Sequence, residues 1–342
     1  MTALSDALQK IASGSDLTAS EMQGALSVIM TGLGTDAQIG AFLMGLRVKG
    51  ESVEEIVAAA EVLRGLSVPV VVQDRRYLVD TCGTGGDGAS TFNISTGAAL
   101  VCACAGAKVA KHGNRSVSSR SGSADVLEAA GVALALSPAH VASCVDTLGL
   151  GFLFAPRHHE AMRYAAGPRK ELGVRTLFNL LGPLTNPARA PHQLVGVFSA
   201  ALLSPFALAL QALGSLHVLV VHSDDGLDEI SPQGTTEVCE MQAGQLRRYR
   251  IRPSEFGLTE GPLALLKVGD ASESLAMLMA VLEGRETGPA STAVAMNAGA
   301  ALYAAGIAAD IGDGVARARV ILQEGSGAAK LRELAAFTQA CV

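Results

Sequence analysis

The sequence predicts an α/β protein, with a small all-helical N-terminal domain before a large α/β domain whose mainly parallel central sheet is flanked by helices. Residues 1–66 carry helix-start patterns ahead of apolar residues at helical spacing. From residue 77 onward, short apolar strands alternate with loops and helical segments, which is typical of a parallel sheet. The length of 342 residues, with 49% hydrophobic and 17% charged residues, suits two packed domains.

In the N-terminal region, three capping-box patterns predict helix starts: Thr18 with Glu21, Thr35 with Gln38, and Ser52 with Glu55. Gly34 and Gly50 stand where helices are expected to stop. Residues 66–74 break the helical pattern and indicate a connection between domains. We therefore expect a helical domain over residues 1–72 and an α/β domain over 73–342.

In the second region the expected elements follow one another as strand, loop and helix. The predicted strands are 77–79, 108–110, 132–136, 194–198 and 217–221. The predicted helices are 97–105, 123–130 with a serine cap at its start, and a helix within 167–184 that ends in a Gly-Pro and Asn-Pro loop.

Composition excludes several classes of protein. Twenty-six Lys and Arg against 32 Asp and Glu give a net charge of −6, which argues against a nucleic-acid-binding protein. Six cysteines show no C-x-x-C spacing and are expected to be reduced apolar residues. The N-terminus lacks a signal-peptide pattern, and the uncharged stretch 291–309 is rich in Ala and Gly, which favours a buried helix over a membrane span. We expect a cytoplasmic protein that does not bind membranes.

The first glycine-rich loop, 83–88, follows a strand, and the polar run Asn93-Ile-Ser95-Thr96 begins the next helix. Glycine lets successive backbone N–H groups turn toward an anion, and a helix N-terminus favours phosphate. The pattern is neither a P-loop nor a dinucleotide fingerprint. A tight structural turn is the competing interpretation for the glycines alone, and the polar helix start favours anion binding.

The second loop places Lys111, His112, Asn114 and Arg115 directly after a strand, among serines and glycines. Open α/β sheets bind ligands at the carboxyl ends of their strands, so both loops are expected on one edge. Two such loops suggest a ligand with two phosphate ends. Solvated surface charge is the alternative for the two cations, and His112 suits a structural role as well as an acid–base role.

A third element holds four carboxylates in six positions: Asp224, Asp225, Asp228 and Glu229. Such a cluster is costly without a cation, and Mg²⁺ prefers one or two carboxylates with water and phosphate oxygens. The alternative is an acidic surface turn.

Residues 80–131, 176–187 and 226–231 together resemble the anthranilate phosphoribosyltransferase family of tryptophan biosynthesis. Lys-His-Gly-Asn-Arg-Ser at 111–116 with Gly-Thr-Gly-Gly-Asp at 83–87 is highly specific to that family, and the resemblance runs over essentially the whole chain. It implies a Mg²⁺-dependent pentosyltransferase that transfers the phosphoribosyl group of phosphoribosyl diphosphate (PRPP) to the amine of anthranilate. The products are N-(5-phosphoribosyl)anthranilate and diphosphate, in the second step from chorismate to tryptophan. It further implies a homodimer through the helical domain and a segment near 160–185 that returns to that domain.

Matched by motif, the resemblance implies three groups of site residues and no covalent nucleophile or obligatory base. The PRPP group is Gly83, Gly86, Asp87, Thr91, Asn93, Ile94, Ser95, Thr96, Lys111, His112, Gly113, Asn114, Arg115, Ser116, Val117, Ser118, Ser119 and Ser123. The anthranilate group is Gly83, His112, Asn114 and Arg169, and one or two Mg²⁺ ions fall to Ser95, Asp228 and Glu229. Gly167-Pro168 and Glu160 depart from the family pattern near the expected anthranilate pocket.

Three other functions fit part of the pattern. A nucleoside phosphorylase of the same architecture has a similar glycine-rich loop but lacks the Lys-His-Gly-Asn-Arg run. A catalytically silent PRPP-like or nucleic-acid-binding relative is disfavoured by the net charge and by the intact Asp228-Glu229 pair. The common PRPP-binding fold requires a hydroxyl-glycine loop directly after Asp224-Asp225, which is absent.

Overall fold

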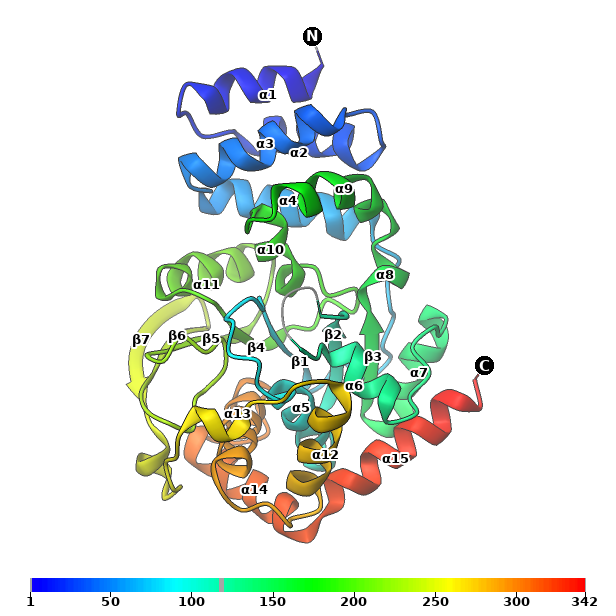
Figure 1. Cartoon of the computed structure of the whole chain (residues 1–342), viewed down its shortest axis with the longest axis vertical. Coiled ribbons are helices and arrows are strands. Elements are labelled where there is room, and N and C mark those ends of the chain that lie inside the picture. Colours follow the sequence, from blue (N-terminus) through cyan, green and yellow to red (C-terminus); the bar gives the residue numbers. More distant parts are fainter. Residues whose placement is uncertain (1, 117–119, 342) are drawn as a thin grey trace.

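The computed structural model describes residues 2–116 and 120–341, which form a helical unit at the N-terminal end and an α/β unit beside it (Figure 1). The helical unit begins with α1 (Ala3–Ala12), α2 (Ala19–Met30), α3 (Asp36–Lys49) and α4 (Val53–Leu66). The three capping boxes are confirmed, because Thr18, Thr35 and Ser52 each accept a hydrogen bond from the N–H three residues later.

The helix stops are confirmed at one glycine and wrong at the other. Gly50 caps α3 with a φ of 87°, a backbone conformation that favours glycine. α2 already ends at Met30, ahead of Gly34, and the positive φ in that turn falls on Gly32. Sequence alone did not distinguish Gly32 from Gly34, because both stand in the short turn between α2 and α3.

Two later helices return to the helical unit. α9 (Arg163–Leu172) packs against α2 and α3, and α10 (Leu177–Leu181) packs against α3 and α4 (Figure 1). The expected single helix within 167–184 is therefore wrong, because Gly173 with a φ of 61° ends α9 and separates it from α10. We propose the division 1–72, with a returning segment near 160–185, and 73–342, on the support of this packing.

The α/β unit is built on one seven-stranded sheet, in the order β3-β2-β1-β4-β5-β6-β7. Its strands are β1 (Leu78–Gly83), β2 (Lys108–Gly113), β3 (Leu150–Phe154), β4 (His192–Gly196), β5 (His217–Ser223), β6 (Thr236–Gln242) and β7 (Gln245–Ile251). β1 to β5 pair in parallel, whereas β6 and β7 form an antiparallel hairpin on the edge of β5. The predicted α/β class with a mainly parallel sheet is confirmed.

Several strand predictions differ from the structure. Residues 132–136 form no strand: they are an irregular connection between two helices, and apolar side chains in it, including Val132 and Leu136, are buried in the core. The third strand of the parallel set is β3 instead, in a stretch that sequence reasoning passed over. The first strand runs four residues further than expected, to Gly83, and the second runs three further, to Gly113, because the sheet pairs residues whose polar character does not mark them as strand.

Helices cover both faces of the sheet. The remaining long ones are α5 (Ile94–Cys104), α6 (Ser123–Ala129), α7 (Pro138–Leu148), α11 (Leu203–Ala212), α12 (Ala271–Leu282), α13 (Pro289–Ala304), α14 (Ile311–Glu324) and α15 (Ser326–Gln339), with a short α8 (Ala155–His158). α6 begins at Ser123, but its N-cap is Gly122, so the expected serine cap is wrong. The side chain of Asp125 accepts the Gly122 N–H instead.

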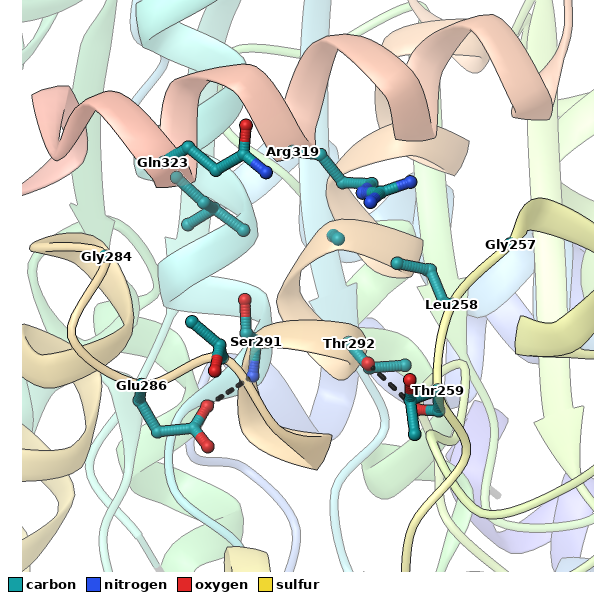
Figure 2. Close-up of a pocket in the computed structure, with 12 residues that line it drawn as sticks. Gly257, Leu258, Thr259, Gly284, Glu286, Ser291, Thr292, Arg319 and Gln323 are labelled. Carbon is teal, nitrogen blue, oxygen red and sulfur yellow. Dashed lines mark hydrogen bonds between the residues drawn. The ribbon is translucent and has the colours of Figure 1, made fainter.

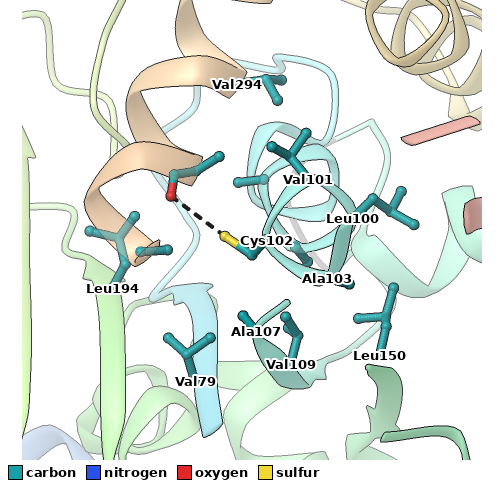
Figure 3. Packing of buried hydrophobic residues seen from close by; sticks show 14 of the residues in the cluster. Val79, Leu100, Val101, Cys102, Ala103, Ala107, Val109, Leu150, Leu194 and Val294 are labelled. Atoms are coloured by element: carbon teal, nitrogen blue, oxygen red, sulfur yellow. Dashed lines mark hydrogen bonds between the residues drawn. The ribbon is translucent and has the colours of Figure 1, made fainter. Parts of the chain in front are cut away.

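Alternation along the strands divides the core between the two faces. Leu194 packs with α5 and α13 on one face, while its neighbour Val195 packs toward α11 and the helical unit. Figure 3 shows the first of these clusters, in which Val79, Val109 and Leu194 meet α5 and Cys102 donates to the Ala298 carbonyl at 3.5 Å. All six cysteines are free thiols.

The expected buried helix is α13, whose Ala-rich sequence is almost entirely inaccessible to solvent. Small side chains let it pack closely against α14, since a Cβ on Gly299 would lie 2.5 Å from the Val315 nitrogen. Over the described ranges, no helix combines the length and apolar character needed to cross a membrane.

A buried carboxylate joins the antiparallel edge to the helices behind it. Glu240 on β6 accepts hydrogen bonds from His217 Nε2 at 3.0 Å and from the Tyr303 hydroxyl at 2.8 Å. Burial alone raises the pKa of this carboxyl, but hydrogen bonds from His217, Tyr303 and Tyr249 lower it to about 2. The ionised form therefore stabilises the fold above its ordinary pKa, and that contribution is lost as pH falls toward 2.

We expect Glu240→Gln to lower the free energy of unfolding at pH 7 by about 2 kcal/mol. Because the Glu240 carboxyl takes up a proton at pH 3.5 in the unfolded chain but stays ionised in the folded protein, the difference between the two proteins should shrink by about 1 kcal/mol on going to pH 3.5. Urea unfolding at both pH values measures it. Glu237→Gln, which alters an ion pair on the same strand, is the control; a pH-independent difference for Glu240→Gln would contradict the assignment.

Candidate functional site

Three parallel strands end in glycine at the same edge of the sheet: β1 at Gly83, β2 at Gly113 and β4 at Gly196. Gly83 and Gly196 are paired directly across β1 and β4. A Cβ on Gly196 would lie 1.5 Å from the Asp228 carbonyl oxygen, and one on Gly83 would lie 2.5 Å from Asp228 Oδ2. The missing side chains therefore let the turn after β5 cross over two neighbouring strands.

The first glycine-rich loop opens directly above this crossing. Gly85, Gly86 and Gly88 have φ values of 67°, 78° and 73°, which side-chain-bearing residues rarely adopt. The Gly85 N–H donates to Asp228 Oδ2 at 2.7 Å, so the loop and the crossing turn are joined. Runs of left-handed glycine turn backbone N–H groups to one side, which suits an anion.

Asn93 connects the two loops. It stands at the N-cap of α5, but its side chain makes no capping bond. Its Oδ1 accepts from the hydroxyls of Ser121 at 2.9 Å and Ser274 at 2.7 Å, and its Nδ2 donates to the Ser121 carbonyl. The first N–H groups of α5 are thus left without a side-chain cap and lie beside the second loop.

Lys111 is buried beneath the site rather than extended from it. Its ammonium donates to the Thr81 carbonyl and to Ser95 Oγ, the latter at 3.1 Å. Burial lowers the pKa of Lys111, while the neighbouring Asp80 and Glu229 carboxylates oppose that shift. The alternative interpretation of Lys111 as a solvated surface charge is therefore wrong, because its ammonium is buried near the carboxylates of Asp80 and Glu229.

Two of the four carboxylates in the acidic turn face the site. Burial raises the pKa of Asp228 well above its usual range, and the nearby Asp87 and Glu229 carboxyls raise it further. Burial raises the pKa of Glu229 to about 7, against the opposing effects of Lys111 and of a hydrogen bond with Ser95. The positive charge of nearby residues does not balance the carboxyls of Asp228 and Glu229, so a cation fits between these two carboxyls.

The other two carboxylates serve the fold. Asp224 forms an ion pair with Arg250 on β7, and Asp225 accepts from the Ser231 hydroxyl at 2.6 Å. Asp228 and Glu229, the two residues that we predicted for a cation, are therefore the carboxylates that lie at the site, whereas Asp224 and Asp225 are bonded elsewhere.

Four buried polar atoms have no hydrogen-bond partner among the described residues: Thr96 Oγ1, His112 Nε2, His159 Nε2 and Thr176 Oγ1. Thr96 lies in the first turn of α5 and His112 at the end of β2, so unsatisfied groups border this edge of the sheet. Buried polar atoms without partners are uncommon in native proteins and are found at functional sites. Their position supports a binding function for this edge.

His112 and His159 face each other with ring centroids 5.2 Å apart. His112 Nδ1 lies 3.1 Å from the Gly182 carbonyl, which can only accept, so the proton is on Nδ1 and Nε2 is an acceptor. Burial lowers the pKa of His112 to about 3 and that of His159 to about 4, so both rings are neutral at pH 7. A neutral His112 can accept a hydrogen bond from a ligand but cannot act as an acid.

Two predicted arginines differ in their surroundings. Arg115 is bridged to Asp125 and Glu128, with the nearer contact at 2.7 Å, and therefore lacks a free guanidinium in this structure. Arg169 on α9 stacks over Phe178 at 5.3 Å, and burial lowers its pKa. Arg169 thus presents a partly buried cation on the helical side of the site.

The remaining predicted residues lie along the same two loops. Gly86 and Asp87 are in the first loop, Thr91 forms an isolated bridge with Lys267, and Asn114 and Ser116 follow β2. Ile94 points into the core and its N–H donates to the Phe92 carbonyl, so it offers the site little. Ser123 Oγ donates to the Asn114 carbonyl at 3.4 Å. Val117, Ser118 and Ser119 lie outside the described residues.

Two residues near the site were missed from the sequence. His159 had only its place in a His-His pair as a signal, and Arg175 had none, because it lies next to the first loop only in the folded chain. Over the ranges 2–116 and 120–341, no three His, Cys, Asp or Glu side chains form a metal-binding group. Asp228 and Glu229 would need the Ser95 hydroxyl and ligand oxygens to complete a metal's coordination.

A separate cavity of about 180 Å³ lies between α13, α14 and the loop 257–259 (Figure 2). In it Glu286 accepts the Ser291 N–H at 2.9 Å, and Arg319 and Gln323 project from α14 above. It contains none of the predicted site residues and lies apart from the glycine-ended strands.

The chain resembles known proteins over its whole length. Residues 75–328 match the glycosyl transferase family, a/b domain, and residues 5–67 match the helical bundle domain of the same family. The anthranilate phosphoribosyltransferase of Thioalkalivibrio sulfidiphilus is 54% identical over 338 residues, covering 99% of each chain. That of Alkalilimnicola ehrlichii is 56% identical over 333 residues, covering 97% of each.

Solved structures agree with the sequence relatives. Anthranilate phosphoribosyltransferase from Thermus thermophilus has a TM-score of 0.92 and 45% identity, covering 98% of this chain and 99% of its own. The Saccharomyces cerevisiae enzyme in complex with PRPP and Mg has a TM-score of 0.87 and 28% identity, covering 98% of each chain. The same yeast enzyme has also been solved with 4-fluoroanthranilate.

We expect Gly196→Ala to destabilise the protein by about 3 kcal/mol, because its Cβ would meet the backbone of Asp228. Gly83→Ala should cost less, since the carboxylate side chain that it meets can rotate away. Urea unfolding provides the ranking. Gly65→Ala in α4, where a Cβ meets open space, is the matched control and should be neutral or slightly stabilising. Equal stability of the Gly196 and Gly65 variants would contradict the close crossing.

Proposed function

Because the chain belongs to the anthranilate phosphoribosyltransferase family, we propose that its two glycine-rich loops form the PRPP site of that enzyme. The activity is transfer of the phosphoribosyl group from PRPP to the amine of anthranilate, which yields N-(5-phosphoribosyl)anthranilate and diphosphate. One observation carries the assignment of the site: the Asp228 turn, the first loop and the start of α5 meet above the glycine ends of β1 and β4.

The diphosphate of PRPP is assigned to the first loop and the mouth of α5. Left-handed Gly85, Gly86 and Gly88 and the uncapped first turn of α5 offer backbone N–H groups and the positive end of a helix dipole. Ser95 and Thr96 add hydroxyl groups, and the unpartnered Thr96 Oγ1 supports a ligand there. The second loop, from His112 to Ser116, is assigned to the ribose 5-phosphate end.

The donor set fits magnesium. Asp228 and Glu229 have raised pKa values that a bound cation would reverse, and Ser95 supplies an oxygen beside them. An ion held by these three residues would supply positive charge beside the diphosphate leaving group. The yeast enzyme has been solved with PRPP and Mg, which supports a magnesium requirement, and we propose one or two ions at these three residues.

Anthranilate is assigned to the face between β2 and α9. Arg169 would pair with the carboxylate of anthranilate, for which a planar guanidinium is a good match. Asn114 would contact the anthranilate ring. His112 would border this pocket as a neutral hydrogen-bond acceptor, because burial keeps its pKa near 3. Gly83 leaves room where the two substrates meet.

In the reaction, the bond from ribose carbon 1 to the diphosphate oxygen breaks and takes its electron pair to the diphosphate. The anthranilate nitrogen forms the new bond to carbon 1 and then loses a proton. The protein's share is to hold the two reactants in line and to stabilise the negative charge on the leaving group through N–H and O–H donors. We assign no covalent nucleophile and no obligatory base.

We also propose a homodimer that forms through the helical unit, in a cytoplasmic enzyme that needs no nucleic acid or membrane. Leu33 and Val48, which are 76% and 77% exposed on the helical unit, support an apolar contact there. Family membership supports the rest of this assignment.

The function is tested by following anthranilate fluorescence after PRPP is added. We expect fluorescence to fall with time only when Mg²⁺ is present, because product formation consumes anthranilate. No loss of fluorescence in the presence of PRPP and Mg²⁺ would overturn the assignment.

We expect Asp228→Ala combined with Glu229→Ala to reduce turnover at limiting Mg²⁺ by at least about 100-fold, since the charge on the leaving group would lose its cation. The fold should persist, which circular dichroism checks. A double control, Asp224→Ala with Glu237→Ala, removes two carboxylates of the outer surface and should keep near wild-type turnover. Wild-type turnover of the first variant would remove the pair from the site.

We expect Arg169→Ala to raise the KM for anthranilate about 10- to 100-fold, because a charge-assisted bond to its carboxylate is lost. The KM for PRPP should change little. Arg163→Ala, on the same helix but exposed beside Tyr164, is the matched control for steady-state kinetics. Equal increases in both KM values would show that Arg169 does not hold the carboxylate.

A further inference from the structure

Arg175 lies against the first glycine-rich loop although it is 89 positions further along the chain than Gly86. It stands in the short connection between α9 and α10. Its guanidinium carbon is 4.3 Å from the centre of the Phe198 ring, and a Cβ on Gly86 would lie 3.6 Å from its Nε. The side chain thus crosses from the helical side of the molecule to the loop.

The surface on which Arg175 rests is attached to the same loop. The Phe198 N–H donates to Thr84 Oγ1 at 3.1 Å, and the Thr84 N–H donates to the Gly196 carbonyl at 2.9 Å. The backbone of Phe198 is therefore hydrogen-bonded to the loop. Stacking on an aromatic face restricts a guanidinium without using its N–H donors.

Arg175 has hydrogen-bond donors available that Lys111 and Arg115 lack. Lys111 is buried and bonded to Thr81 and Ser95, and Arg115 is held by two carboxylates. Arg175 is exposed, and no hydrogen bond or ion pair joins it to another residue in the described parts of the chain. A cation placed beside a glycine anion cradle, with its donors uncommitted, fits a polyanion that binds in that cradle.

We propose that Arg175 binds the diphosphate group of PRPP and of the diphosphate product. The inference rests on the proposed PRPP site and adds to it a residue from the connection between α9 and α10. The planar guanidinium presents paired N–H groups to phosphate oxygens, which a lysine ammonium cannot do in the same geometry. As the leaving group gains negative charge, that contact strengthens.

A second consequence concerns the two parts of the molecule. α9 packs on the helical unit, whereas the first loop belongs to the α/β unit. A diphosphate held by both Arg175 and the loop therefore links the units through the ligand, whereas anthranilate would not engage this arginine.

Calorimetric titration of the full-length protein with PRPP and with inorganic diphosphate, each with Mg²⁺, tests the proposal. Arg175→Met keeps a flexible apolar side chain over Phe198 but removes the charge, and it should weaken diphosphate binding about 10- to 100-fold. Arg175→Lys keeps the charge without the planar pair of donors, so its affinity for diphosphate should lie between those of the wild-type protein and Arg175→Met. Arg319→Met, an exposed arginine of the distant cavity in Figure 2, is the matched control and should bind as wild type does.

The readouts separate the possible failures. Wild-type affinity of Arg175→Met for diphosphate, or weaker binding by Arg175→Lys than by Arg175→Met, would overturn the inference while leaving the proposed PRPP site intact. No binding of PRPP by the wild-type protein would overturn the proposed site itself. Anthranilate affinity, measured by fluorescence, should be unchanged in Arg175→Met; an equal loss for both ligands would indicate general disruption and contradict the proposal.

Discussion

The site depends on one close approach, that of the Asp228 backbone to the glycine ends of β1 and β4. A side chain at Gly196 would overlap the Asp228 carbonyl, and one at Gly83 would meet its carboxylate. Because these strands end in glycine, the turn after β5 crosses both of them and delivers Asp228 to the Gly85 N–H. Asp228 and Glu229, which follow β5, thereby reach the first loop, which follows β1. Without this close approach the two segments would lie apart.

At the same edge of the sheet, buried charges and polar atoms lack partners when no ligand is bound. Buried Asp228 and Glu229 have raised pKa values, and the ammonium of Lys111 is a buried cation that opposes the shift at Glu229. Four polar atoms in the described chain lack partners, and two of them, Thr96 Oγ1 and His112 Nε2, belong to the elements that carry the loops. Such groups reduce stability in the empty protein, since each was desolvated without a compensating bond. A cation and a polyanion would supply the missing charges and donors, so binding and stability are linked at this edge.

Local signals were predictable from the sequence, and long-range ones were not. The capping boxes at Thr18, Thr35 and Ser52 involve residues three apart, so the local sequence pattern is enough to predict these helix starts. The two loops were also found, because glycine and polar residues after apolar strands identify them. Residues 132–136 resemble a strand in sequence but form an irregular connection over the core, whereas β3 was overlooked. The pairing of Arg115 with Asp125 and Glu128, the burial of Lys111 and the approach of Arg175 all depend on tertiary packing, which one sequence does not reveal.

The most direct test of the crossing as the origin of the site is a crystal structure with PRPP and Mn²⁺, located by its anomalous scattering. We expect a manganese peak bonded to carboxylate oxygens of Asp228 or Glu229, with the diphosphate against the N–H groups of residues 85–88. A metal and a diphosphate bound away from the ends of β1 and β4 would contradict it.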